Sequence, residues 1–443
     1  MPIFLGDFAS FVDGKKDDLR NKVLKGKPNW LEEDFKKYVN AHWVSLEESL
    51  NDFTVSPADL DILAVDSSTY TNLLSNGGIF YIIRSLAVQK DIVSKRLEVD
   101  IIFSKDKMSR IHELITAKME MLEFEVALEA LKNGFSGDAV LLDGSLYGRV
   151  SHVPIESKAE EERDALLRYF KVYKELLDFC ERSGILLVGV SKESRSTFYR
   201  DYLLSLIFDE KLKEVDIGEE DKKRLREIFY QILDVEKIAF SKFSKLKEKY
   251  GDKLETIELI LKELTSSRPD YQLIMNYVYS IGFMRPLLLG PSIRMARRLR
   301  EYHENPRGSV EKYFPRLSME KGADFIQWAV QVLRSILDFP SFVSLYILLD
   351  PRDSPIRIDM PYYGKSLFEV GWSEPAEVDV SNLLKVMVSG YCGLNAYNLW
   401  LKNVDEKVRL RRKVVDEIYL PYLEKLFGEK IIRGRGYRRV KFP

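Results

Sequence analysis

Two apolar runs that each end in an aspartate constrain the fold of this chain more than any other feature. Residues 62–65 lead directly into Asp66, and residues 139–142 lead directly into Asp143. Short, continuously apolar runs bounded by polar residues are typical of buried β-strands. Ligands bind at the carboxyl edge of such sheets, so both carboxylates are expected where a site would form. If the two strands are neighbours, the carboxylates converge.

The segments around these runs alternate between strand and helix patterns. Strands are predicted for residues 79–88, 99–103 and 185–192. Residues 109–131 and 160–183 carry apolar side chains at helical spacing. This order predicts an α/β fold with a mixed β-sheet flanked by helices, rather than a helical bundle or a β-sandwich.

The rest of the chain divides into predicted parts around that core. We predict a polar helical N-terminal arm for residues 1–50 and the first part of the core for 51–208. A charge-rich helical insertion or subdomain is predicted for 209–340, and a completion of the core with a basic tail for 341–443. Within the last part, helices are predicted near 381–403 and 406–427. The length of 443 residues allows two or three domains, or one core with a large insertion.

The composition indicates which atoms would hold a metal. The chain has only 4 His and 2 Cys, the latter being Cys180 and Cys392, which excludes a disulfide scaffold and a Cys-rich zinc site. Two carboxylates about 4 Å apart repel by about 4 kcal/mol at an effective dielectric constant of 20. A divalent cation such as Mg²⁺ or Mn²⁺ relieves that repulsion and prefers oxygen ligands. The alternative is that each aspartate only caps the turn that follows it.

A third acid is predicted from the helix at 109–131. Glu123 lies about 60° from the centre of the apolar stripe, at the margin of the buried face. Glu120 and Glu125 point further toward solvent, and Glu129 is nearer the helix end. Such a carboxylate is either a ligand aimed at the sheet or a solvated edge residue, and the helix alone leaves both open.

Four motifs carry a resemblance to a known family. They are Leu-Ala-Val-Asp-Ser-Ser at 63–68, Val-Leu-Leu-Asp-Gly-Ser-Leu at 140–146, Leu-Val-Gly-Val-Ser-Lys at 187–192, and Pro-Ile-Arg-Ile-Asp-Met-Pro at 355–361. At this spacing they resemble the successive motifs of the NurA nuclease family, over roughly residues 55–430. The resemblance implies an RNase H-like core, related to the PIWI module.

The resemblance also implies roles for residues. Asp66, Asp143 and the helical Glu123 would be metal ligands and catalytic residues, and Lys192 would contact phosphate or the attacking water. The family tends to place a His or Asp near the start of a C-terminal helix after a Tyr-Pro pair. Residues 388–398 lack both, and Tyr397 or Asn398 stands about where the ligand belongs, so Asn398 is expected as the remaining metal ligand. Asp359 is a further neighbour of the site, or else a strand-edge Asp held by Arg357 or Arg352.

As an activity, the resemblance implies a metal-dependent DNA nuclease of archaeal or bacterial type. It would use Mn²⁺ or Mg²⁺, with two ions, as a 5′–3′ exonuclease with endonuclease activity on single-stranded DNA. Its role would be DNA-end processing for recombinational double-strand-break repair, as a homodimer together with the hexameric HerA translocase. Two alternatives stay open: a weakened or inactive DNA-binding adaptor that docks on a hexameric ATPase, and a structural scaffold.

Clusters of basic residues are the expected contacts to DNA. Phosphate contacts or base stacking are predicted for Arg195, Arg294, Arg297, Arg298, Arg435, Tyr437 and Arg438. The alternative is a solvated charged helix face and a polar tail, and the tail could equally dock a partner ATPase.

Near-neutral charge excludes a histone-like polycation but not a local basic surface. The chain has 68 Lys and Arg against 69 Asp and Glu, a formal net charge of −1. No signal-peptide pattern and no membrane-spanning apolar stretch is evident, so we expect a cytoplasmic protein with no membrane contact. Many charged residues with few Gln, Cys and His are typical of thermophile proteins.

Overall fold

The computed structural model describes residues 3–24, 31–233 and 238–434, and it divides the chain into two compact units. The larger unit comprises Glu48–Ser191, Pro286–Leu345 and Ile358–Pro443. The smaller unit comprises Met1–Glu47, Lys192–Arg285 and Tyr346–Arg357. No helix in these described parts is long and apolar enough to cross a membrane.

A mixed β-sheet is the centre of the larger unit. Its neighbouring strands, in spatial order, are β10, β6, β5, β2, β3 and β4. β4 and β3 are antiparallel, as are β3 and β2, while β5 and β6 run parallel to β2. Their bounds are β2 Ile62–Leu73, β3 Ile79–Val88, β4 Ile92–Ile102, β5 Ala139–Asp143, β6 Leu186–Ser191 and β10 Ile356–Ser366. The predicted mixed sheet of RNase H-like type is confirmed.

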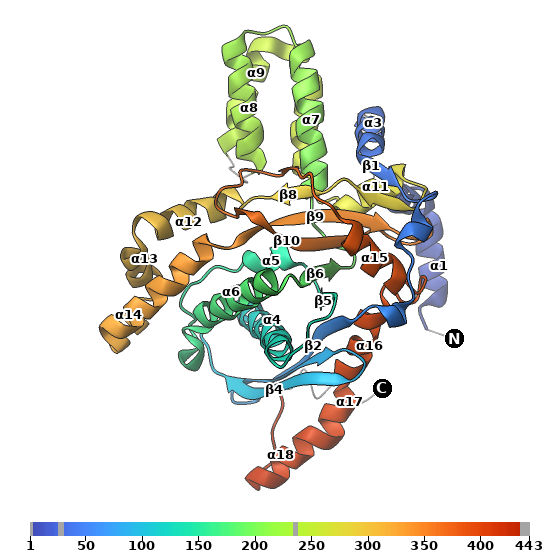
Figure 1. Cartoon of the computed structure of the whole chain (residues 1–443). Coiled ribbons are helices and arrows are strands. Elements are labelled where there is room, and N and C mark those ends of the chain that lie inside the picture. The colour runs from blue at the N-terminus through green and yellow to red at the C-terminus, as the bar shows by residue number, and fades with distance from the viewer. Residues whose placement is uncertain (1–2, 25–30, 234–237, 435–443) are drawn as a thin grey trace. The chain divides into compact units, whose positions relative to one another are not determined.

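Helices cover both faces of this sheet. α4 (Met108–Lys132) and α6 (Ala165–Ser183) pack together, and α4 packs against β2, β3 and β4 (Figure 1). Side chains alternate between the two faces of a strand. Accordingly Leu63 and Val65 join the apolar core under α4, whereas Tyr70 faces a second cluster that contains Leu410. α16 (Leu399–Val408) packs against β2 and β3 and carries the chain to that second cluster.

β2 continues past the aspartate at which it was predicted to end. Its parallel pairing with β5 stops at Val65, opposite Leu142, but its antiparallel pairing with β3 continues to Leu73. Asp66 therefore lies inside a strand, at the point where the parallel neighbour ends. The sequence could not show this because the extra length depends on pairing with β3.

The C-terminal helices are shorter than predicted. α15 (Ser381–Gly390) and α16 are separated by a loop in which Gly393 has φ +89°, a conformation that favours glycine. After α16 the chain is extended over residues 409–411. It is then helical from α17 (Arg412–Val414) through a π-helical segment (Val415–Tyr419) to α18 (Leu420–Phe427). The predicted helix over 381–403 is thus two helices with a loop between them.

The predicted insertion over 209–340 is divided between the units. α12 (Ile293–Glu304), α13 (Pro306–Tyr313) and α14 (Pro315–Leu337) belong to the larger unit. They bury side chains such as Phe314 and Leu333 in the same apolar core as α4 and α6, and this packing explains the division. β8 (Leu287–Leu289) pairs with β9 (Pro340–Leu348) and with β11 (Glu374–Pro375) in the same unit.

The smaller unit is largely helical. Its strands β1 (Trp43–Ser45) and β7 (Gly282–Met284) pair antiparallel, and β7 pairs with the end of β9. Its helices are α1 Leu5–Gly14, α2 Lys16–Leu24, α3 Glu32–His42, α7 Phe198–Glu214, α8 Glu219–Leu233, α9 Ile238–Tyr250, α10 Glu255–Leu264 and α11 Asp270–Tyr277. The predicted N-terminal arm therefore contains a strand as well as helices.

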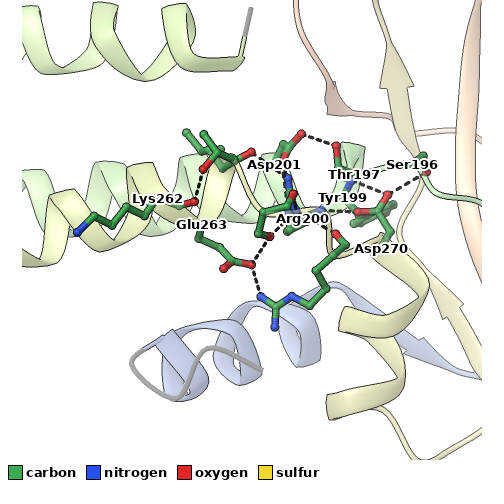
Figure 2. A network of polar contacts seen from close by, with 12 residues as sticks. Ser196, Thr197, Tyr199, Arg200, Asp201, Lys262, Glu263 and Asp270 are labelled. Atoms are coloured by element: carbon green, nitrogen blue, oxygen red, sulfur yellow. Dashed lines mark hydrogen bonds and ion pairs between the residues drawn. The ribbon is translucent and has the colours of Figure 1, made fainter. Parts of the chain in front are cut away.

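A buried polar network ties the start of α7 to α11 (Figure 2). The Asp270 carboxylate accepts hydrogen bonds from the amides of Tyr199 (3.2 Å) and Arg200 (2.8 Å), which lie in the first turn of α7. The Ser196 hydroxyl also donates to it, at 3.2 Å. Because the first amides of a helix lack partners within the helix, Asp270 satisfies them from another helix and stabilises α7.

Candidate active site

Asp66 and Asp143 lie side by side on neighbouring parallel strands. Val65 of β2 is opposite Leu142 of β5, so the next residue on each strand is an aspartate. Partners in a parallel register point to the same face of the sheet. The two strands are neighbours, which is the condition for the carboxylates to converge, and both acids are on the face covered by α16.

The surroundings of Asp66 disfavour its ionised form. Its side chain is only 9% exposed. Burial, followed by the negative charges of Glu123 and Asp143, raises the pKa of Asp66 to about 8, although the Ser67 amide donates a hydrogen bond of 2.8 Å to it. Excess negative charge is therefore concentrated here, which is the condition that a bound divalent cation would relieve.

Glu123 is the glutamate of α4 whose negative charge raises the pKa of Asp66. One of its carboxylate oxygens accepts a hydrogen bond from the Ser67 hydroxyl, and the other accepts one from the Arg149 guanidinium. Burial raises its pKa to about 7, against the lowering effect of Arg149. Glu120 is instead hydrogen-bonded to His152 (2.9 Å) and Tyr169 (2.7 Å).

The other two glutamates of α4 face different surroundings. Glu129 bonds to Ser94 at 2.8 Å and pairs with Arg96 at 3.1 Å, and both partners are on β4. Glu125 is half-buried, and burial raises its pKa. Of the four candidates, only Glu123 shares a contact with Ser67, the residue that follows Asp66.

Arg149 connects two of the acid-bearing elements. It lies on the one-turn helix α5 (Leu146–Val150), and its guanidinium donates to Glu123 and, at 2.8 Å, to the backbone carbonyl of Asp143. The turn between β5 and α5 requires a glycine at position 144, because its φ of +108° is unfavourable for other residues. Gly189 of β6 lets the turn approach closely, since a Cβ there would lie 2.7 Å from the Gly144 oxygen.

Asp359 of β10 supports the same turn. Its carboxylate accepts hydrogen bonds from the Ser145 hydroxyl and, at 3.3 Å, from the Tyr147 amide. The residue is fully buried. Asp359 is therefore a neighbour that holds the segment following Asp143.

On the loop before α16, the residue that contacts the acids is Tyr397. Its hydroxyl donates to Asp143 at 3.2 Å, and burial together with the charge of Asp143 raises its pKa. The expected ligand Asn398 instead caps α16, where its side-chain oxygen accepts a hydrogen bond from the Leu401 amide at 3.1 Å. This hydrogen bond gives Asn398 a capping role at the start of α16.

Asp405 is an acid that the sequence analysis missed. It lies about two turns into α16, and its charge contributes to the raised pKa of both Asp66 and Tyr397. Its carboxylate pairs with Arg409. A sequence signal was present: Asp405 comes four residues after the buried Leu401, at the margin of the apolar face of the helix.

Asp66, Glu123, Asp143 and Asp405 all carry carboxylate oxygens, the ligands that a divalent cation such as Mn²⁺ or Mg²⁺ prefers. As the side chains stand in the described part of the chain, no group of three or more His, Cys, Asp or Glu is arranged around a metal position. Two of the four acids are engaged by arginines: Glu123 by Arg149 and Asp405 by Arg409.

The other predicted residues are placed as follows. Lys192 and Arg195 are exposed in the segment after β6 and belong to the smaller unit. On α12, Arg297 is exposed and Arg298 lies 5.2 Å from the centre of the Tyr313 ring. The side chain of Arg294 lies outside the described residues, as do Arg435, Tyr437 and Arg438.

Comparisons with known proteins agree with the α/β fold and its central mixed sheet. A family model described as the NurA domain matches residues 60–410. The NurA nuclease of Sulfolobus solfataricus has the same fold, with a TM-score of 0.54 at 14% identity over 96% of this chain and 98% of that one. A NurA structure with dAMP and manganese gives 0.41 at 15% identity, with the same coverage of 96% and 98%. A comparison with curated protein sequences found no match.

Proposed function

Because the chain belongs to the NurA family, a family of nucleases, we propose that it hydrolyses DNA phosphodiester bonds with the help of a divalent metal ion. The observation that carries the proposal is the convergence of Asp66 and Asp143 on neighbouring strands, with the charges of Glu123 and Asp405 acting on Asp66. Mn²⁺ or Mg²⁺ is the proposed ion, as a pair of ions.

The residues divide the work as follows. Asp66, Glu123, Asp143 and Asp405 would hold the metal. When bound, a divalent ion lowers the pKa of the attacking water and stabilises the leaving 3′ oxygen. Tyr397 orients Asp143 through its hydroxyl. Lys192 is proposed to contact phosphate or the attacking water.

The proposed hydrolysis does not need a histidine as general base. The oxygen of water forms a bond to phosphorus, the bond from phosphorus to the 3′ oxygen breaks, and the 3′ oxygen takes up a proton. The proton that water loses passes to solvent or to a carboxylate of the site.

The finer features of the proposal rest on membership of the family. We propose 5′–3′ exonuclease activity with endonuclease activity on single-stranded DNA, in the processing of DNA ends for recombinational double-strand-break repair. A hexameric ATPase of HerA type is the proposed partner, a homodimer the proposed assembly, and the cytoplasm of a thermophile the proposed setting.

An assay on 5′-labelled single-stranded and duplex DNA tests the activity. With Mn²⁺ the full chain should shorten or cut the DNA, and EDTA should abolish cleavage. Asp66→Asn and Asp143→Asn should each reduce the rate by more than about 100-fold, since even outer partners of metal ligands change activity by about 10- to 100-fold. Lack of cleavage by the wild type with Mn²⁺ or Mg²⁺ would refute the proposal.

Glu129→Gln is the matched control for Glu123→Gln, because both residues lie on α4 but Glu129 bonds to β4. Glu129→Gln should leave the rate of cleavage unchanged.

Asp405 also bears on the alternative of an inactive adaptor. That alternative arose from a missing C-terminal ligand, and Asp405 supplies an acid from the same helix, so we favour the active enzyme.

A further inference from the structure

We propose that residues 407–413, here called the basic strap, bind the phosphates of the DNA strand that enters the acid site. The proposal rests on the proposed nuclease function and adds to it a binding surface for the substrate. What points to it is the attachment of a cationic segment to the strand that carries Asp66.

The strap is strongly positive. Five of its seven residues are cationic and none is acidic: Lys407, Arg409, Arg411, Arg412 and Lys413. All five side chains are exposed. Arg409 pairs with Asp405, and Arg412 lies 3.8 Å from Asp416. For Arg411 and Lys413, no acidic partner occurs among the residues that the structure describes.

The two apolar residues of the strap fix its orientation. Val408 is fully buried, and Leu410 packs in the cluster with Tyr70 and Ile82. Side chains of an extended segment alternate in direction. With Val408 and Leu410 turned into the protein, Arg409 and Arg411 are turned toward solvent, as phosphate contacts require.

The backbone of the strap is held by a pair of residues on the sheet. Ser68 of β2 and Arg84 of β3 are cross-strand partners. The Ser68 hydroxyl accepts a hydrogen bond of 2.8 Å from the Leu410 amide, and the Arg84 guanidinium donates to the carbonyls of Val408 and Arg409. Three polar contacts on three consecutive residues make this segment a fixed surface.

This attachment places the cations next to the acids. Ser68 and Asp66 are two residues apart on one strand, so their side chains share a face about 6.8 Å apart along it. Arg409 reaches Asp405, whose charge acts on Asp66. An acid site repels a polyanion, and adjacent cations are the means by which such a site attracts one.

The chemistry of the strap favours a nucleic acid strand over other anions. Several cations in a row suit a ligand with regularly spaced single charges, and binding to such a ligand depends steeply on salt. An acidic protein segment would be the other polyanion, and it is an outcome of the test below.

The experiment measures DNA binding and chemistry separately. A double variant, Arg411→Ala with Lys413→Ala, removes the two cations that have no acidic partner among the described residues. Its affinity for a labelled oligothymidylate is measured in EDTA over a range of salt concentrations, in the full-length chain. We expect about tenfold weaker binding, and a log–log salt slope that is smaller by about 1.4, since each single-strand phosphate contact contributes about 0.7.

Two controls make the result specific. Lys105→Ala with Arg110→Ala removes the same charges from exposed positions at the start of α4 and should change nothing. Exchanging the two cations, Arg411→Lys with Lys413→Arg, should restore binding. Hydrolysis of thymidine 5′-p-nitrophenyl phosphate, a small ester that cannot span the strap, should be unaffected by the double alanine variant while KM for the oligonucleotide rises.

Unchanged binding and salt slope in the double alanine variant would overturn the proposal, and so would an equal loss with the small ester. Weaker binding of an acidic peptide, with DNA binding intact, would overturn it in favour of a protein partner. Failure of the nuclease proposal is distinguishable, because it would appear as a wild type that binds DNA but cleaves neither substrate.

Discussion

Arg149 and Glu123 form a buried ion pair whose loss has a calculable effect. Their side chains are 4% and 3% exposed, and the guanidinium also donates to the Asp143 carbonyl. Replacing Arg149 by Met keeps most of the side-chain volume but leaves the Glu123 carboxylate without its cation. We expect this variant to be less stable than the wild type and to bind Mn²⁺ less well.

The magnitude follows from burial. Removing one partner of a buried ion pair costs about 3–5 kcal/mol, because the other charge is left uncompensated. The lost hydrogen bond to Asp143 adds about 1 kcal/mol. In Arg149→Met with Glu123→Gln, no uncompensated charge remains at this pair. The double variant should therefore lose about 2–3 kcal/mol less of its free energy of unfolding than the sum of the losses of the two single variants.

The pH dependence has a definite sign. Burial already raises the pKa of Glu123, and Arg149 opposes that rise. Without Arg149 the pKa rises further, and a carboxyl group with a raised pKa in the folded state loses stability as pH increases through it. The deficit of Arg149→Met should therefore be larger at pH 8 than at pH 5.

Urea unfolding of the metal-free chain, followed by circular dichroism, measures the cycle. Lys118→Met is the matched control, because Lys118 is also a buried cation of the larger unit, paired with Glu98 and Glu162. It should cost comparable stability but leave Mn²⁺ affinity unchanged. Effects of Arg149→Met and Glu123→Gln that add within about 0.5 kcal/mol would refute the coupling.

Four further outcomes are expected. Asp405→Asn should weaken Mn²⁺ binding and reduce cleavage by at least about 10-fold, whereas a metal ligand set confined to the strands predicts no change. Tyr397→Phe should reduce cleavage about 10-fold without loss of fold, as measured by kcat and circular dichroism. Mn²⁺ at 100 times its Kd should raise the free energy of unfolding by about 2.7 kcal/mol, and Asp66→Asn should abolish this rise. Burial raises the pKa of Asp270 from 3.8 to about 6, so the stability difference between wild type and Asp270→Asn should fall by about 2–3 kcal/mol between pH 4 and 6; a flat difference would contradict this.

Local patterns in the sequence were sufficient to predict the mixed sheet and to place Asp66 and Asp143 at the ends of apolar runs. The runs before Asp66 and Asp143 are apolar because both faces of their strands are covered, and that burial is visible in the sequence itself. The angle of Glu123 on α4 made it the preferred glutamate of that helix, but the angle alone left open a solvated edge residue. The pairing of β2 with β5 was left open by the sequence and is given by the structure.

Features that depend on distant contacts were not predictable. The end of β2 is set by β3, and the division of residues 209–340 is set by packing of α12–α14 on the core of the larger unit. Asp405 was missed because only the start of α16 was considered, where Asn398 serves as a cap. The basic strap was missed because its meaning lies in the contact with Ser68, far away in sequence.

The division into two units determines when each unit can fold during synthesis of the chain. Each unit is assembled from three separate stretches, and the boundaries at 345/346 and 357/358 fall inside β9 and β10. Neither unit can complete itself while its last stretch is still on the ribosome, and long-range pairing of this kind is slow. The acids proposed to hold the metal lie between Asp66 and Asp405 in the sequence, so a chain that ends before Asp405 lacks part of the proposed active site.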